Sequence, residues 1–243
     1  MTSENNQIRI SAKQLGSLAL SNVCKRCFWI KLRLHQKLPW QIFPGIFSSI
    51  DSYSKKITWS YYEEFNKLPP WLERYVGSAK PVRCPGYYSF FIVDQDRNIK
   101  LTGVPDEVLL NSDNSFTIVD YKTSRFTETQ EDVLMPMYKV QLNCYALIGE
   151  QCGFSPVSKL LLAYYEPVTN SLDSDPYRLH SVLNKNGFFM PFEPHIEEID
   201  LDPEGIVQPL LQMVREFGNL DEAPAAGTNC TDCRRLRDLL KLL

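Results

Sequence analysis

Residues 101–123, LTGVPDEVLLNSDNSFTIVDYKT, decide the fold of this chain. The polar segment NSDNS at 111–115 separates two apolar runs. Asn, Ser and Asp favour turns, so the two runs are predicted to be consecutive antiparallel strands. Because side chains alternate along a strand, Asp120 and Lys122 should point to the same face of the second one.

Helical and extended patterns are arranged in order on both sides of this hairpin. Ser11 is a candidate helix N-cap. The spacing of apolar residues predicts helices over 12–35, 48–65, 72–79, 135–151 and 204–217, with a short basic helix in the tail 221–243. Strands are expected over 87–94, 100–110, 116–122 and 159–165, and over 180–182 or 197–201. This order predicts one α/β domain over 1–243, with a helical part (1–80), a core (81–201) and C-terminal helices (202–243).

Composition excludes several classes of protein. The chain has 243 residues, 44% of them hydrophobic and 23% charged, which is ordinary for a globular protein. The formal net charge is −3 and the pI is about 5.7, so any nucleic-acid site must be a local basic patch. No apolar run approaches the ~20 residues of a membrane span, and the N-terminus lacks the apolar region of a signal peptide. A cytoplasmic location without a membrane partner is therefore expected.

Two aspartates and a lysine in the hairpin suggest a divalent-metal site. Asp106 precedes the first strand's apolar run, and Asp120 ends the second. Carboxylates at the ends of neighbouring strands suit Mg²⁺ or Mn²⁺. Lys122 could stabilise the negative charge that develops on a phosphate. The alternative is a structural ion pair between Lys122 and one of the aspartates.

The helix predicted after this hairpin carries a polar stripe. Tyr138, Gln141 and Tyr145 are spaced i, i+3 and i+7, which places them on one face. Gln141 and Tyr145 could direct hydrogen-bond donors toward a phosphate. Ordinary amphipathic packing would give the same spacing.

Together these motifs, PD…DxK followed by QLNCYA at 141–146, resemble the PD-(D/E)XK nuclease superfamily. The similarity is greatest to its RecB-type branch, which includes the CRISPR-adaptation iron–sulfur exonucleases. The resemblance implies a restriction-endonuclease-like fold, with a mixed central sheet flanked by helices. It also implies catalytic roles for Asp106, Asp120, Lys122, Gln141 and Tyr145, and a metal-ligating carbonyl on Tyr121.

One departure from the family pattern concerns a histidine. Many members carry a metal-ligating histidine on an upstream helix shortly after a glycine, but Gly45 is followed here by IFSSID. Asp51 is the nearest candidate replacement, although it could be a surface residue of that helix. The three histidines, at 35, 180 and 195, lie outside the expected motif and are interpreted as structural or surface residues.

Four of the seven cysteines form two C-x-x-C pairs at the two ends of the chain. The pairs are Cys24/Cys27 and Cys230/Cys233. Four thiolates suit either a Zn²⁺ ion or an iron–sulfur cluster. The resemblance favours a [4Fe-4S] cluster, although its members usually supply one cysteine from the N-terminal end and three from the C-terminal end. The remaining cysteines, at 84, 144 and 152, are interpreted as small buried apolar residues.

The resulting hypothesis is a divalent-metal-dependent deoxyribonuclease of exonuclease or end-processing type. Its DNA, single-stranded or a duplex end, would be bound by basic residues near the cysteines: Lys25, Arg26, Lys31, Arg33, Arg234 and Arg235. A solvated helix face is the alternative for these charges. Two rival hypotheses remain. One is a catalytically weak or inactive nuclease-fold module that binds DNA or a protein partner in a larger complex; the other is a zinc-stabilised protein with no nucleic-acid role.

Overall fold

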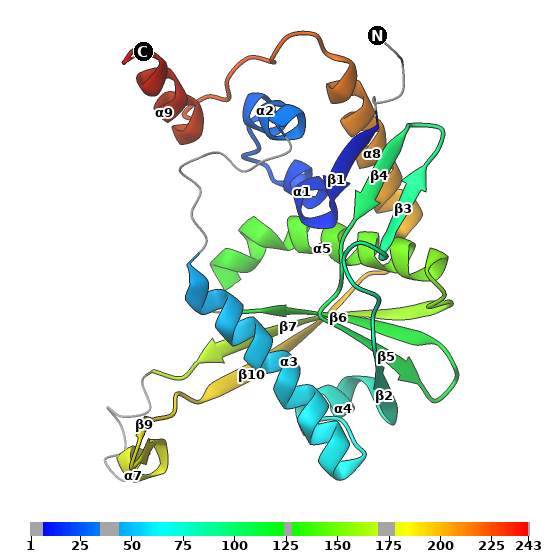
Figure 1. The fold of residues 1–243 in the computed structure, drawn as a ribbon, viewed down its shortest axis with the longest axis vertical. Helices are drawn as coiled ribbons and strands as arrows, with labels where there is room; N and C mark the ends of the chain where they lie inside the picture. The colour runs from blue at the N-terminus through cyan, green and yellow to red at the C-terminus, as the bar shows by residue number, and fades with distance from the viewer. Residues whose placement is uncertain (1–6, 35–43, 124–127, 170–177, 243) are drawn as a thin grey trace.

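The computed structural model describes residues 7–34, 44–123, 128–169 and 178–242. Its centre is a five-stranded mixed sheet in the order β10-β7-β6-β5-β2 (Figure 1). The strands are β2 (Ala79–Val82), β5 (Glu107–Asn111), β6 (Phe116–Lys122), β7 (Val157–Pro167) and β10 (Phe192–Ile199). β5 and β6 form the antiparallel hairpin that the sequence predicts, and β6 pairs with β7 in parallel.

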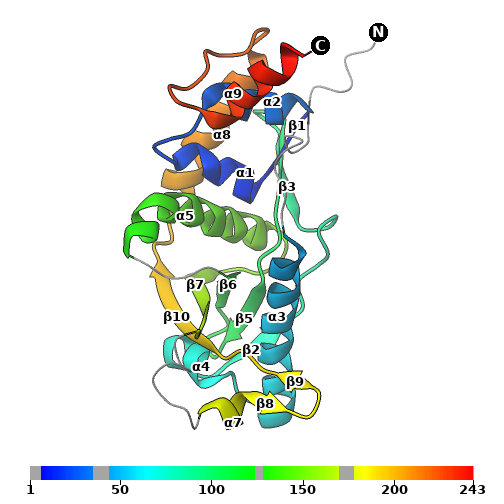
Figure 2. The ribbon, with the colours of Figure 1, turned by 90° about the vertical axis from the view of Figure 1, so that its left-hand side faces the viewer.

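Helices cover both faces of this sheet (Figure 2). α5 (Glu128–Gln151) packs on one face, where Ile118 belongs to the larger hydrophobic core. α3 (Gly45–Phe65) and α4 (Pro70–Val76) lie on the other, where Val119 and Tyr121 belong to a second core. The alternation predicted for β6 is thus confirmed, and the predicted restriction-endonuclease-like α/β architecture is correct.

The predicted strand 100–110 is in fact two strands in different sheets. β4 (Ile99–Thr102) lies between β1 (Ile8–Ser11) and β3 (Phe91–Asp94) in a three-stranded sheet. β5 begins only at Glu107. Pro105 has no backbone N–H to donate and restricts the residue before it, so the chain leaves one sheet here and enters the other.

Most of the predicted helices are present with shifted ends. The range 12–35 contains α1 (Ala12–Gly16), the 3₁₀ helix η1 (Ser17–Ala19) and α2 (Lys25–Leu34), and Ser11 caps α1 by accepting from the Gln14 N–H. α8 (Pro203–Asn219) and α9 (Thr231–Leu240) follow the last strand. No helix among the described residues is both long and apolar enough to cross a membrane.

Two strand predictions were inaccurate. Residues 87–90 form a turn, so only the end of the predicted strand 87–94 is extended. Residues 180–182 lie in a helix, α7 (Arg178–Val182), which precedes the small hairpin of β8 (Leu183–Asn184) and β9 (Gly187–Phe188). The alternative, 197–201, overlaps the end of β10. Strands this short carry too few residues for periodicity to distinguish them from turns.

Candidate active site and candidate metal centre

β6 brings Asp120 and Lys122 together on the sheet face that α5 covers. The Lys122 ammonium forms an ion pair with Asp120 Oδ2. It also donates to Gln141 Oε1 at 3.2 Å, and Gln141 Nε2 donates to Asp120 Oδ1 at 3.3 Å. Asp120 is only 4% exposed. The three side chains therefore form a closed, buried ring of contacts, as strand alternation and the stripe on the helix predict.

The polar stripe on α5 supports this ring from one side. Gln141 Nε2 also donates to the Tyr145 hydroxyl at 2.6 Å, and the Tyr138 ring lies 4.5 Å from Lys122 Nζ. Gly103 leaves room for Tyr145, because a Cβ there would lie 2.7 Å from Tyr145 Cε1. The predicted members of the stripe thus meet the strand end that carries the acidic residue.

Asp106 lies beside this ring at the start of β5. Its Oδ2 accepts the Tyr121 N–H at 2.6 Å, and its own N–H donates to the Val119 carbonyl at 3.2 Å. Its Oδ1 pairs with Lys55 Nζ at 2.7 Å. The backbone of β6 therefore fixes the Asp106 carboxylate next to Asp120.

Lys55 is a member of the site that the sequence analysis missed. It comes from α3 and bridges two carboxylates, Asp106 and Asp51, the latter at 3.0 Å. The i, i+4 spacing of Asp51 and Lys55 indicated a pair on one helix face. It could not indicate which face meets the sheet, because that depends on tertiary packing.

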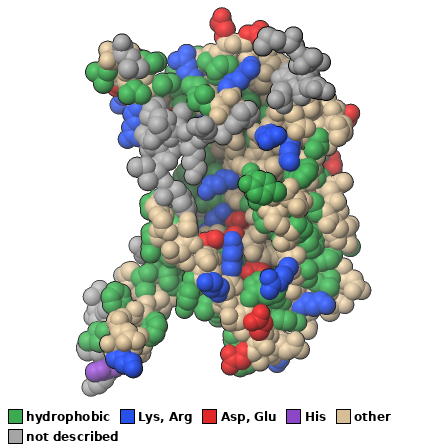
Figure 3. Space-filling model, in the orientation of Figure 1, with side chains coloured by type: hydrophobic (Ala, Val, Ile, Leu, Met, Phe, Trp, Pro, Cys, Tyr) green, Lys and Arg blue, Asp and Glu red, His purple; other side chains and the backbone are tan. Residues whose placement is uncertain are grey.

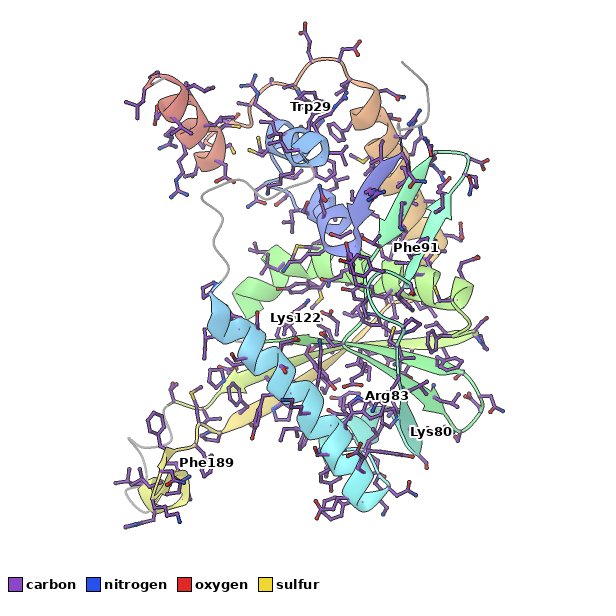
Figure 4. All side chains as sticks on the ribbon, viewed as in Figure 1. Trp29, Lys80, Arg83, Phe91, Lys122 and Phe189 are labelled. Atoms are coloured by element: carbon purple, nitrogen blue, oxygen red, sulfur yellow. The ribbon has the colours of Figure 1, made fainter. Side chains whose placement is uncertain are left out.

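Burial and mutual repulsion govern the electrostatics of the carboxylates. Burial, followed by the charge of Asp120, raises the pKa of Asp106 to about 6, although Lys55 opposes the shift. Burial alone would lower the pKa of Lys55, but Asp106 and Asp51 reverse this and raise it. Charged side chains of both signs gather beside a hollow near the middle of this face (Figure 3), and Figure 4 shows Lys122 there.

Glu107 is a second buried acid that the sequence analysis did not single out. It is 3% exposed, and burial raises its pKa to about 8. Its Oε2 accepts the Trp59 Nε1–H at 2.9 Å. Its Oε1 has no hydrogen-bond partner among the described residues. The PDE sequence carried no signal for this role, since the residue alternates to the face opposite Asp106.

The four paired cysteines meet where the two ends of the chain come together. α9 lies beside α2 (Figures 1 and 2), and the four Sγ atoms lie within 4.8 Å of one another. Cys27 Sγ is 3.5 Å from Cys230 Sγ and 3.4 Å from Cys233 Sγ. The predicted joining of the N- and C-terminal helices at a four-cysteine cluster is confirmed.

Backbone amides stabilise the negative charge on one of these thiols. The Gly227 N–H donates to Cys24 Sγ at 3.2 Å. Burial would raise the pKa of Cys24, but this amide, the Cys27 N–H and the neighbouring thiols lower it to about 6. Burial and the neighbouring thiols raise the pKa of Cys27 instead. Cys24 can thus supply one of the thiolates that a metal requires.

Several of the basic residues predicted to bind DNA have structural partners. Arg26 Nε donates to the Pro224 carbonyl at 2.9 Å, and Arg33 Nη2 donates to the Leu220 carbonyl at 2.5 Å. The Arg33 guanidinium also lies 5.2 Å from the centre of the Trp29 ring. These arginines therefore hold the connection between α8 and α9 against α2. Lys25, Arg234 and Arg235 are exposed, and Lys31 is half-buried.

A hollow of about 540 Å³ opens beside the cysteine cluster. Its basic lining residues are Arg26, Arg234, Arg237 and Lys241. Arg234 and Arg237 form no ion pair with a described carboxylate. The hollow is therefore suited to an anion.

With this geometry established, comparisons with known proteins identify the family. Residues 49–236 match the family model of the PD-(D/E)XK nuclease superfamily. The chain belongs to this superfamily. No curated protein matches it significantly. Among solved structures, the alkaline exonuclease LHK-Exo from Laribacter hongkongensis is similar at 11% identity and a TM-score of 0.45, covering 97% of this chain and 95% of that chain. The protein SSO0001 is similar at 13% identity and a TM-score of 0.35, covering 92% and 81%.

Asp106 and Asp120, with the Lys122 and Gln141 side chains around them, form an acidic cluster. This cluster fits the divalent metals that PD-(D/E)XK nucleases use. Asp120 Oδ2 contacts the Lys122 ammonium but accepts no hydrogen bond from a described residue. The neighbouring Asp106 carboxylate is close enough for the two acids to repel each other. Two crowded carboxylates with spare oxygen lone pairs are hard ligands that suit Mg²⁺ or Mn²⁺. The roles of the Tyr121 carbonyl and of Asp51 as further ligands of this metal remain predictions from the sequence.

The remaining histidines and cysteines contribute none of the contacts described above for the acidic ring or the cysteine cluster. His180 is exposed on α7, and His195 Nε2 contacts Glu197 Oε1 on β10 at 2.5 Å. His35 lies outside the described residues. Cys144 is fully buried, while Cys84 and Cys152 are half-buried, which agrees with their interpretation as packing residues.

Proposed function

We propose that this protein is a divalent-metal-dependent deoxyribonuclease of the RecB-type branch, acting as an exonuclease or end-processing enzyme. The observation that carries the proposal is the buried ring of Asp120, Lys122 and Gln141 with Asp106 at its side. Burying so many charges is costly unless they are paired or bind a ligand. Hydrolysis of a phosphodiester is the chemistry that this set suits best.

Each residue of the cluster has a defined task in this reaction. Asp106, Asp120 and the Tyr121 carbonyl would hold the cation, which supplies Lewis-acid polarisation of a phosphoryl oxygen. Lys122, positioned by its ion pair with Asp120, stabilises the negative charge that accumulates on the phosphate. Gln141 keeps Lys122 in place, and Tyr145 keeps Gln141 in place.

The proposed DNA path runs between this cluster and the cysteine site. The exposed cations of α2 and α9, Lys25, Arg234 and Arg235, would neutralise backbone phosphates, with Lys31 beside them. Arg26 and Arg33 would contribute mainly by fixing the α8–α9 connection, given their carbonyl partners.

A second candidate function is a nuclease-fold module with weak or no activity, which binds DNA or a protein partner. Lys55 favours it, because its ammonium occupies the space between Asp106 and Asp51 and competes with a cation there.

A DNA-cleavage assay distinguishes the active nuclease from the inactive module. The protein is dialysed against EDTA and supplied with Mg²⁺ or Mn²⁺, with end-labelled linear DNA and covalently closed circular DNA as substrates. Degradation of linear DNA alone supports an exonuclease; binding without cleavage of either substrate supports the module.

We also propose that the four paired cysteines hold one metal centre. Zn–S bonds of about 2.3 Å in a tetrahedron place sulfurs just under 4 Å apart, which is similar to the observed 3.4 and 3.5 Å. The [4Fe-4S] cluster implied by the resemblance binds each thiolate to a different iron and needs wider spacing. Sulfur geometry thus favours Zn²⁺. Colourless protein with one zinc per chain supports it, whereas brown protein absorbing in the visible supports the cluster.

A reducing compartment follows from this part of the proposal. The site needs free thiolates, which persist in the cytoplasm rather than in oxidising compartments. We therefore place the protein in the cytoplasm. Fractionation of the source cells tests this placement.

A further inference from the structure

Arg83 is an exposed cation that has no anionic partner among the described residues. It follows β2, and its guanidinium lies over the Trp59 ring, 5.3 Å from the ring centre. A guanidinium stacked on an indole is held in orientation by the cation–π attraction. Its planar N–H donors stay available for the oxygens of a phosphate.

The stack is fixed from beneath by a buried acid that adjoins the candidate active site in the chain. The Trp59 indole donates to Glu107, which is buried and follows Asp106 in the chain. Trp59 also lies one helical turn after Lys55, the partner of Asp106. Arg83 is therefore held by an aromatic ring whose own position is fixed by a hydrogen bond to the buried neighbour of Asp106.

The surface around Arg83 continues the basic side of the site. Lys80 is exposed on the edge strand β2. In the view of Figure 4, Arg83 and Lys80 are labelled near each other, on the side of Lys122 that is away from α2 and α9. In the same orientation, blue side chains continue past the central hollow (Figure 3). This direction differs from the one toward α2 and α9, so a strand crossing the site would meet cations on both sides.

We propose that Arg83 binds a backbone phosphate of the nucleic-acid strand outside the acidic cluster, with Trp59 and Glu107 as its positioning residues. This inference rests on the proposed function, because it assumes a strand that crosses Asp106 and Asp120. An arginine fits this role better than a lysine, since its fork can contact two phosphate oxygens together.

Salt dependence of binding tests this contact directly. A fluorescent single-stranded oligodeoxynucleotide is titrated with the Asp120→Asn variant, which we expect to bind without cutting, at several salt concentrations. Adding Arg83→Gln should weaken binding several-fold and reduce the slope of log K against log salt by about 0.7, the contribution of one phosphate contact on a single strand. Arg83→Lys should keep the slope and lose affinity. Trp59→Phe, which lacks the indole N–H, should do the same.

Arg97→Gln is the matched control, because Arg97 is already paired with Asp94 and should leave the slope unchanged. If the Asp120→Asn parent binds DNA and Arg83→Gln does not change its salt slope, the assignment of Arg83 is wrong. The proposed function would then still stand. No binding of nucleic acid by the Asp120→Asn parent or the wild-type protein would overturn both. Equal affinity of Arg83→Lys and the Asp120→Asn parent would contradict the proposal that the guanidinium contacts two phosphate oxygens together.

Discussion

The acidic cluster and the cysteine cluster are built in opposite ways. The acidic cluster lies at the end of β6, where buried strands and α5 hold Asp120, Lys122 and Gln141, and Lys55 reaches Asp106 from α3. The cysteine cluster joins elements from the two ends of the chain, and α9 buries no residue of its own. In the first region the fold positions the ligands. In the second, we expect a bound metal to hold the two ends of the chain together.

This difference separates the expected effects of mutations. A change in the acidic cluster should remove chemistry and spare folding, since packing around it is complete without a metal. A change in the cysteine cluster should remove stability, because binding of a structural metal is itself folding free energy.

The largest effect is expected from Asp120→Asn. It removes a carboxylate of the site while Lys122 keeps its contacts with Gln141 and the Tyr138 ring. Cleavage of DNA should fall by about 10³-fold, the scale seen when one preorganised electrostatic group is lost. The protein should stay folded, because relief of the repulsion with Asp106 offsets the loss of the ion pair with Lys122. Rates from end-labelled DNA and thermal melting measure both.

Lys139→Gln provides the matched control for changes of charge at this site. Lys139 lies on the same helix as Gln141, but it pairs with the exposed Asp200 at 3.5 Å. Its loss should leave the rate and the melting temperature unchanged within error. Comparable losses of cleavage rate in Asp120→Asn and Lys139→Gln would show that the acidic cluster has no special role.

Cys27→Ser should give the largest loss of stability. It opens the metal site and frees α9, and a loss of even about 4 kcal/mol lowers the melting temperature by roughly 10 °C in a chain of this size. Metal content and calorimetry measure the effect. Cys152→Ser, at a half-buried thiol outside the cluster, should keep the metal. Freshly purified, reduced protein with neither zinc nor iron would remove the basis for the contrast between the two regions.

Gly103→Ala should affect the acidic cluster through packing alone. The new methyl would lie 2.7 Å from Tyr145 Cε1 and 3.0 Å from Ala12 Cβ. Overpacking of this kind costs about 1–3 kcal/mol, and displacement of Tyr145 should slow cleavage several-fold. Gly149→Ala is the control, since its nearest neighbour would be Ile118 Cδ1 at an ordinary 3.5 Å. Equal rates in the two variants would exclude a role for the position of Tyr145.

The smallest effect on stability is expected at the ion pair of Asp94 and Arg97, which belongs to neither region. Burial would raise the pKa of Asp94, but hydrogen bonds and the charge of Arg97 lower it overall. The pair therefore stabilises the protein above the ordinary carboxyl pKa of about 4, and this contribution is lost as pH falls through the lower folded-state value. Asp94→Asn should cost less than about 1 kcal/mol at neutral pH. A cost that changes between pH 7 and pH 5 in denaturant titrations would contradict this.

The sequence predicted the local parts of both regions well. NSDNS located the hairpin turn, strand alternation joined Asp120 to Lys122, and helical spacing added Gln141. Each of these relations spans a few residues within one element or turn, where periodicity is informative. The C-x-x-C spacing likewise predicted the cysteine cluster, because two such pairs are typical of a four-thiolate metal site.

Contacts between distant elements were beyond the sequence. Lys55 and Trp59 reach the site only because α3 crosses the sheet at one particular angle. Arg26 and Arg33 are on a basic helix face, yet they donate to carbonyls of the α8–α9 connection. From charge alone, this helix face was predicted to bind nucleic acid. Charge could not show that the arginines instead donate hydrogen bonds to a neighbouring segment of the chain.

Binding of Mn²⁺ tests the central claim most directly. Electron paramagnetic resonance measures free Mn²⁺ as it is titrated into EDTA-dialysed protein whose cysteine metal is first confirmed by elemental analysis. Wild-type protein should bind Mn²⁺ and regain DNA cleavage, whereas Asp120→Asn should bind it at least about tenfold more weakly and stay inactive. Equal Mn²⁺ binding and equal cleavage by the two proteins would contradict the assignment of Asp106 and Asp120 as the catalytic metal site.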